Sequence, residues 1–138
     1  MSCRPNETAQ TVSLRVFRSG GAVDETVLVY FGSRGPYRFI LDTGASFTLI
    51  DRSVVDQLHL PIVGAPRTLS GIFGSGPARV VHVTTWRAED VSLPAADVYT
   101  AKGQFFNPFI SGLLGSDVLS KFQSIIIDFE GGRLIFCG

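Results

Sequence analysis

The sequence is built from short runs of β-branched and aromatic residues that are separated by glycine-rich turns. Residues 26–31 form one such run, residues 32–36 a turn, and residues 37–41 the returning strand of a predicted hairpin. Only two short segments, 53–58 and 116–121, are predicted as helices, the second one capped by Ser116. This pattern predicts a mainly β fold, a closed or partly open barrel with one or two short helices.

Further short strands follow the first hairpin, and glycine-rich turns connect some of them. They are predicted at residues 47–50, 67–72, 79–86, 91–93, 96–100, 124–129 and 133–136. Residues 73–77 form a flexible glycine-rich turn within one hairpin, and residues 130–132 form the turn of the last hairpin. No linker-like stretch interrupts this series, so we predict a single domain.

Length and charge limit what the chain can do. Its 138 residues suit one domain, which we assign to residues 11–138, preceded by a polar N-terminal segment at residues 1–10. Twelve Lys and Arg residues balance twelve Asp and Glu residues, so no basic surface is expected to bind nucleic acid. The longest apolar run, residues 27–31, is far shorter than a membrane-spanning helix. We therefore expect membrane contact only through a segment outside this chain.

Two cysteines and two histidines are the candidate metal or redox residues. Cys3 and Cys137 lie at opposite ends of the sequence, and we interpret them as two unpaired thiols. The alternative is a bridge, within or between chains, which would require an oxidising compartment. Because His59 and His82 do not have the spacing of metal ligands with these cysteines, no metal or other cofactor is expected.

Residues 39–46, Phe-Ile-Leu-Asp-Thr-Gly-Ala-Ser, form the most informative stretch of the sequence. Asp42 directly follows an apolar strand, where a carboxylate without partners would be costly to bury. Thr43 supplies a hydroxyl group, and Gly44 allows backbone or substrate to approach closely. The alternative interpretation is that Asp42 is only a turn residue at the end of a strand.

A second stretch, residues 111–119, places Leu113, Leu114 and Gly115 immediately before a predicted helix. Gly115 lies 73 residues after Asp42, and a glycine-rich hairpin lies between the two motifs. Together these features resemble the retropepsin-like aspartic proteases, the single-domain relatives of pepsin. The resemblance extends over most of the chain, and the terminal hairpin makes the sequence look closer to the bacterial members than to the viral ones.

The resemblance implies roles for individual residues. Asp42 would be the catalytic aspartate, Thr43 the residue whose hydroxyl braces it, and Gly44 part of the backbone that faces the substrate. Other residues would bind the substrate, either beside Asp42, behind its loop or in the mobile hairpin that the family calls the flap. These residues are Ala45, Ser46, Gly71, Ile72, Phe73, Gly74, Leu113 and Leu114.

The sequence contains one Asp-Thr-Gly motif, whereas hydrolysis without a covalent intermediate needs one group to accept a proton and another to donate one. The resemblance therefore implies a C2 homodimer in which two Asp42 carboxylates share one proton. Peptide or protein substrates with apolar residues near the cut are expected. The alternatives are a catalytically silent module that binds peptides in the same groove, and a monomeric interaction module. Bacterial relatives suggest a periplasmic or otherwise extracytoplasmic location.

Two positions depart from the pattern of many viral members. Ser46 and Ser116 are neutral where those proteins carry an acidic and a basic residue that pair near the dimer contact. That ion network cannot form here, so the dimer must depend on other contacts, and the terminal strands are candidates. We interpret Asp117 as a negative charge that stabilises the start of the second helix.

Overall fold

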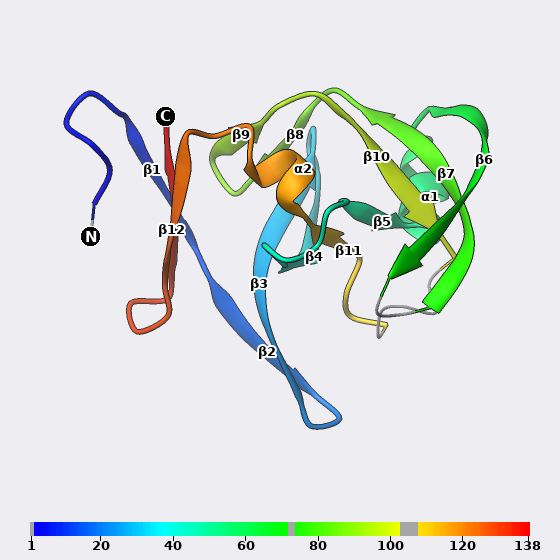
Figure 1. Cartoon of the computed structure of the whole chain (residues 1–138). Coiled ribbons are helices and arrows are strands. Elements are labelled where there is room, and N and C mark those ends of the chain that lie inside the picture. The colour runs from blue at the N-terminus through cyan, green and yellow to red at the C-terminus, as the bar shows by residue number, and fades with distance from the viewer. Residues whose placement is uncertain (1, 72–73, 103–107) are drawn as a thin grey trace.

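The computed structural model of the chain describes residues 2–71, 74–102 and 108–138 (Figure 1). These residues form two sheets and two short helices, α1 (Arg52–Leu58) and α2 (Ser116–Leu119). The strands are β1 (Ala9–Ser13), β2 (Arg15–Ser19), β3 (Ala22–Phe31), β4 (Arg34–Leu41), β5 (Leu49–Asp51), β6 (Ile62–Gly71), β7 (Gly74–Val83), β8 (Trp86–Ala88), β9 (Val91–Leu93), β10 (Ala96–Ala101), β11 (Gly112–Leu114), β12 (Ser124–Asp128) and β13 (Arg133–Cys137). The prediction of a mainly β fold with two short helices is confirmed.

The large sheet carries the core. Its strand order is β6-β7-β10-β5-β11-β4-β3-β8-β9, and β2 pairs with β3 outside this path. Most neighbouring strands are antiparallel, but β11 is parallel to β4 and β10 is parallel to β5. Because β6 and β9 are not paired with each other, the sheet remains open among the described residues. Val27, Phe39, Ile50 and Leu114 are completely buried within it.

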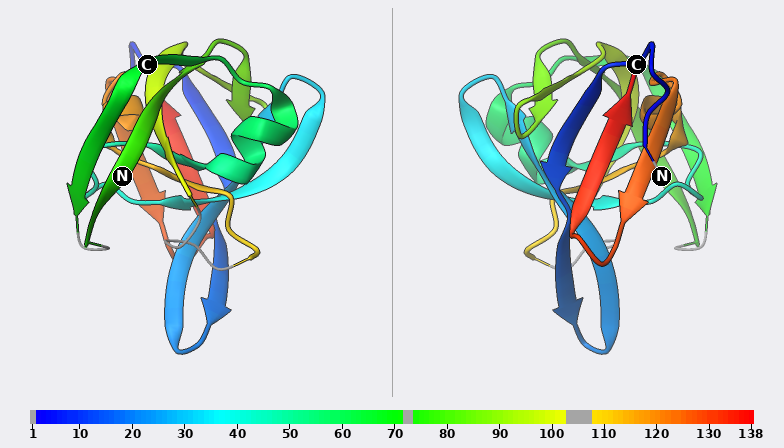
Figure 2. Two further views of the ribbon diagram at one scale, coloured as in Figure 1. Left: turned by 90° about the vertical axis from the view of Figure 1, so that its right-hand side faces the viewer. Right: turned by 90° about the vertical axis from the view of Figure 1, so that its left-hand side faces the viewer.

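The small sheet has the order β1-β13-β12 and stands at one side of the large sheet (Figures 1 and 2). The inward-facing Val12, Leu134 and Phe136 are almost completely buried. At the junction between β1 and β2, the Ser13 N–H donates to both carboxylate oxygens of Glu89, at 3.2 and 3.1 Å. These contacts fix the small sheet to the turn between β8 and β9.

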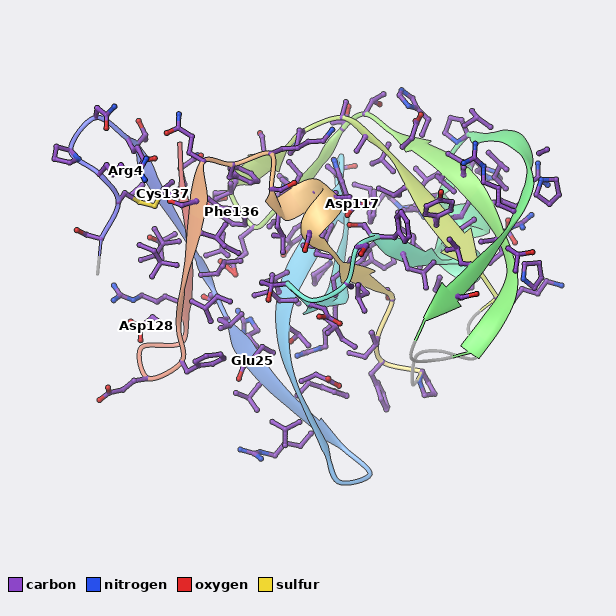
Figure 3. All side chains as sticks on the ribbon, in the orientation of Figure 1. Arg4, Glu25, Asp117, Asp128, Phe136 and Cys137 are labelled. Atoms are coloured by element: carbon purple, nitrogen blue, oxygen red, sulfur yellow. A yellow bond between two sulfur atoms is a disulfide. The ribbon has the colours of Figure 1, made fainter. Side chains whose placement is uncertain are left out.

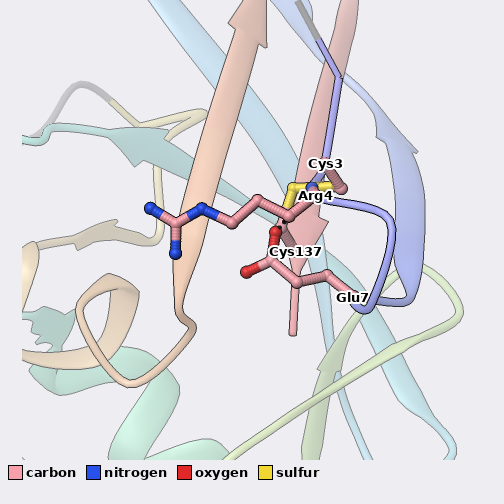
Figure 4. The surroundings of a disulfide bond; sticks show 4 residues. All are labelled: Cys3, Arg4, Glu7 and Cys137. Atoms are coloured by element: carbon pink, nitrogen blue, oxygen red, sulfur yellow. Dashed lines mark hydrogen bonds between the residues drawn. A yellow bond between two sulfur atoms is a disulfide. The ribbon is translucent and has the colours of Figure 1, made fainter.

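A disulfide between Cys3 and Cys137 joins the N-terminal segment to β13, with a Cα–Cα distance of 5.5 Å (Figure 4). The backbones of Thr8 and Gly138 exchange two hydrogen bonds beside it, at 2.8 and 3.1 Å. The interpretation of two unpaired thiols is therefore wrong. The sequence could not reveal the bridge, because the pairing of β1 with β13 is what brings the two cysteines together.

Several predicted element boundaries also change. Strand β4 already begins at Arg34, within the turn predicted at residues 32–36, and β6 begins at Ile62 and not at residue 67. The turn predicted at residues 73–77 is largely strand, because β7 begins at Gly74. The second helix ends at Leu119 and not at residue 121, because the Lys121 and Phe122 N–H groups bond to carbonyls three residues back and tighten the last turn. Among the described residues, neither helix is long and apolar enough to cross a membrane.

Candidate active site

Three short strands bring the two sequence motifs together. Strand β11 lies between β4 and β5, parallel to β4 and antiparallel to β5. Leu114 at the end of β11 stands opposite Leu41 at the end of β4. Because parallel strands end at the same edge of a sheet, Asp42 and Gly115 leave the sheet side by side. The two motifs, far apart in the sequence, are therefore neighbours in the fold.

The backbone around Asp42 is held by short hydrogen bonds. The Asp42 N–H donates to the Leu114 carbonyl at 3.0 Å, and the Ala45 N–H donates to the Asp42 carbonyl at 3.2 Å. The Gly44 N–H donates to Asp42 Oδ1 at 3.0 Å. The half-buried carboxylate is thus oriented by the chain's own turn, while Oδ2 accepts no hydrogen bond from the described residues. This oxygen is available to a water molecule or to a second carboxyl group.

Residues at the start of α2 support the loop from one side. The Ser116 hydroxyl donates to the Thr43 carbonyl at 2.5 Å, and the Ser116 N–H donates to the Ala45 carbonyl at 2.7 Å. The predicted capping role of Ser116 is therefore wrong, because α2 has Gly115 at its N-cap and the hydroxyl bonds to the loop. A Cβ atom at Gly115 would lie 2.7 Å from the Phe47 carbonyl oxygen, so only glycine fits there.

Asp117 and Thr48 form a network that the sequence analysis missed. The Thr48 hydroxyl donates to Asp117 Oδ1 at 2.7 Å and accepts from the Gly115 N–H at 3.0 Å. The Thr48 N–H donates to Asp117 Oδ2 at 3.0 Å. Figure 3 shows Asp117 on α2, beside the segment that joins β4 to β5. Besides lying in the first turn of α2, this carboxylate therefore fixes the helix to the loop that carries Asp42.

The predicted substrate-binding residues fall into three groups. Leu113 and Leu114, in β11 behind the loop, are 5% and 0% exposed, and their contact with a substrate stays a prediction. Ala45 is half-buried and Ser46 is exposed, and both follow Gly44 in the loop after Asp42.

The remaining predicted substrate-binding residues belong to the β6–β7 hairpin. Gly71 is the last residue of β6 and Gly74 the first residue of β7. Ile72 and Phe73 lie outside the described residues. In Figure 2 this hairpin, α2 and the loop after β4 lie on the same side of the molecule.

The two histidines stand apart from this site. His59 is the C-cap of α1 in a left-handed conformation, with φ 54°. His82 on β7 is exposed and its Nδ1 lies 2.6 Å from Asp97 Oδ1 on the neighbouring β10. Within the described part of the chain, no three His, Cys, Asp or Glu side chains are grouped to hold a metal ion.

Comparisons of the sequence and of the fold with known proteins point to one family. A family model described as aspartyl protease matches residues 26–118, more than half of the chain. The fold is similar to a retropepsin-like aspartic protease from Rickettsia conorii, with a TM-score of 0.61 and 17% sequence identity. That match covers 94% of this chain and 98% of the other. No match was found among curated protein sequences. The chain therefore belongs to the aspartyl protease family and has a retropepsin-like fold.

Proposed function

We propose that this member of the aspartyl protease family is an endopeptidase whose active site forms only when two copies associate, each contributing Asp42. The observation that carries the proposal is the setting of Asp42. Its carboxylate is oriented by the Gly44 N–H and its backbone is fixed to Leu114, while Oδ2 is left without a partner among the described residues. A carboxylate that served only to close a turn would not need support from two further elements, β11 and α2.

The chemistry requires two carboxyl groups. A water molecule attacks the carbonyl carbon of the scissile peptide bond, and one carboxylate accepts a proton from that water. The second, protonated carboxyl group donates a proton to the carbonyl oxygen. The C–N bond then breaks as the first carboxyl group gives its proton to the leaving nitrogen and the second takes a proton back from a hydroxyl group of the tetrahedral intermediate. Two carboxylates at about 3 Å share one proton because both cannot be ionised, and aspartic proteases are the established example. Activity is therefore expected to peak on the acidic side of neutrality.

The substrates we propose are extended peptide segments with apolar residues near the cut. The β6–β7 hairpin would cover such a segment, and backbone groups at Gly44 would contact it. Ala45 and Ser46 follow Gly44, so small side chains form the surface next to the Asp42 loop.

The test is cleavage of a mixed peptide library between pH 3 and 7 by the wild type and by Asp42→Asn, at several protein concentrations. We expect cleavage that grows faster than linearly with concentration and a loss of at least about 10³-fold in Asp42→Asn, because the base is removed. Unfolding curves of both proteins serve as the control for folding. Full activity of Asp42→Asn would refute the mechanism, and no cleavage by the folded wild type would favour a silent peptide-binding module.

We also propose that the protein works in an oxidising compartment outside the cytoplasm. The Cys3–Cys137 disulfide supports this, since such bonds persist mainly in secreted and periplasmic proteins. The check is the thiol content of the protein isolated from its own cells with thiols blocked at lysis. Two free thiols per chain would contradict the proposal.

A further inference from the structure

Strand β4 carries a second charged side chain on the face that ends in Asp42. Successive side chains of a strand point to opposite faces, and Phe39 and Leu41 pack with the core. Arg38, Ile40 and Asp42 therefore share the other face, since the Asp42 N–H still pairs with β11. At about 3.3 Å per residue, the Cα atoms of Arg38 and Asp42 are about 13 Å apart, the length of about four residues of an extended peptide.

The Arg38 guanidinium is held in place by neutral groups. Its Nη1 donates to Thr26 Oγ1 at 3.1 Å, and its Cζ lies 5.0 Å from the centre of the Phe17 ring. Thr26 is completely buried, and its hydroxyl donates to the Arg15 carbonyl at 2.9 Å. A guanidinium that contacts an aromatic ring and bonds to a buried hydroxyl has lost part of its side-chain freedom before a ligand binds, which lowers the entropic cost of binding.

Arg38 forms no ion pair with a carboxylate of the described residues. None of the three ion pairs found there includes it, and the residues outside the described part contain no Asp or Glu. On the same face of the β2–β3 hairpin, Arg15 stands opposite Thr26 and Asp24 opposite Phe17. Two arginines and one aspartate therefore give this face a positive charge. Among the described residues only Thr26 accepts a hydrogen bond from the guanidinium, so its other N–H groups are open to a ligand.

Two aromatic rings border the guanidinium. Phe17 on β2 and Phe109 in the segment before β11 have ring centroids 6.1 Å apart, and Phe109 is 70% exposed. The Ser111 N–H donates to the Arg38 carbonyl at 2.8 Å, which fixes this segment to β4. In Figure 1 the β2–β3 hairpin and the segment before β11 extend toward the same, lower side of the molecule. The rings offer apolar contact beside the positive charge.

An apolar side chain lies between Arg38 and Asp42 on this face. Ile40 is half-buried and stands opposite Leu113 of β11 on one side and opposite Thr26 of β3 on the other. Along the face the chain thus presents a carboxylate at Asp42, an apolar side chain at Ile40 and a cation at Arg38. A peptide with an apolar residue near the cut and an acidic residue further along has the complementary order.

We propose that Arg38, Phe17 and Phe109 form a specificity site, the Arg38 site, for an acidic side chain of the substrate about four residues from the scissile bond. A carboxylate accepts two parallel hydrogen bonds from a guanidinium, while the rings contact its methylene groups. The occupant is the substrate because the site continues the face of Asp42 and carries the opposite charge. The inference rests on the proposed function, which places the cut at Asp42.

The first test moves one aspartate along an otherwise uncharged peptide that the wild type cleaves, on both sides of the cut. We expect kcat/KM to be highest with Asp about four residues from the cut, about tenfold or more above the peptide with Asn there. Arg38→Gln should abolish this preference. Because the ratio of the Asp and Asn peptides is taken within one enzyme preparation, a partly unfolded variant does not change it. An Asp preference that persists in Arg38→Gln would overturn the proposal.

The second test reverses the charge. Arg38→Glu is expected to prefer a peptide with Lys at the same position over the one with Asp. The matched control is Arg18→Glu, which makes the same change of net charge on the opposite face of the β2–β3 hairpin, where Arg18 pairs with Val23. We expect Arg18→Glu to keep the preference of the wild type. Equal shifts in both variants would show a long-range effect of net charge and overturn the Arg38 site.

The outcomes for this inference and for the proposed function are distinguishable. Cleavage without any preference for the Asp peptide would overturn the Arg38 site and leave the endopeptidase standing. If the folded wild type cleaves no peptide, calorimetric titration measures binding of the Asp and Asn peptides directly. Binding that favours the Asp peptide, with the preference lost in Arg38→Gln, would support the site and contradict the endopeptidase. Equal or absent binding would then overturn both.

Discussion

At the scale of single residues, Gly44 and Gly115 both lie at the Asp42 loop, but glycine is required at the two positions for different reasons. At Gly115 a Cβ atom would meet backbone oxygens of Phe47 and Ala45, at 2.7 and 2.9 Å, and backbone atoms cannot rotate away. At Gly44 a Cβ atom would lie 3.4 Å from Asp42 Oδ1, and the backbone there is not left-handed. The folded chain thus requires Gly115, whereas a requirement for Gly44 would come from a substrate or a partner.

We therefore predict that two alanine substitutions affect different quantities, one the stability and the other the activity. Gly115→Ala should lower the free energy of unfolding by about 1–3 kcal/mol, because the loop and α2 must move apart. Gly44→Ala should leave that free energy nearly unchanged but lower kcat/KM by about 10²-fold, because the substrate is displaced from Asp42. Urea unfolding and peptide cleavage measure the two quantities. Gly44→Ala with full activity would remove Gly44 from the site.

At the scale of elements, the hairpin of β12 and β13 is closed by a charged turn. The Arg133 guanidinium donates to Asp128 Oδ2 at 2.8 Å, and the Gly131 N–H donates to Asp128 Oδ1 at 2.8 Å. The hydrogen bond from Arg133, followed by that from Gly131, lowers the pKa of Asp128 below its ordinary value of 3.8. Figure 3 shows Asp128 at the end of β12, next to this turn.

This pKa shift predicts a pH dependence of hairpin stability. Because the folded pKa is the lower one, the ionised Asp128 stabilises the folded state above about pH 4, and this contribution is lost as the pH falls through the folded pKa. The coupling between Asp128→Asn and Arg133→Gln in a double-mutant cycle should therefore be present at pH 7 and smaller at pH 2. Denaturant unfolding at both pH values measures it. A coupling of the same size at pH 2 would contradict this account.

At the scale of the whole molecule, the Cys3–Cys137 disulfide connects residues 134 positions apart. A cross-link over so long a segment restricts the unfolded chain much more than the folded one, in which β1 and β13 are already paired. It also keeps the N-terminal segment against the small sheet. We therefore regard the bridge as a support for the small sheet.

Removing the bridge should lower the stability of the whole domain. Cys3→Ser is expected to lower the free energy of unfolding by about 2–5 kcal/mol, and reduced wild type should behave in the same way. The comparison of the two separates loss of the bridge from effects of the substitution itself. Thermal unfolding with and without reductant measures both, and a melting temperature that reductant does not change would argue against this role.

The sequence alone determined the features that depend on neighbouring residues. Alternating apolar runs and glycine-rich turns predicted most strands, and the motifs around Asp42 and Leu113 predicted the family, because each is carried by a few consecutive residues. The ends of the second helix and of the β6–β7 hairpin were predicted less well, since contacts with other elements decide where a strand or helix stops.

Only the tertiary structure decided the contacts that join distant segments. Thr48 bonds to Asp117, 69 residues away, and Cys3 pairs with Cys137. In neither pair do the residues around one partner indicate which residue the other partner is. The order β1-β13-β12 of the small sheet likewise joins the two ends of the chain. Short-range patterns follow from the geometry of the backbone, whereas these pairings exist only after the sheets have brought the segments together.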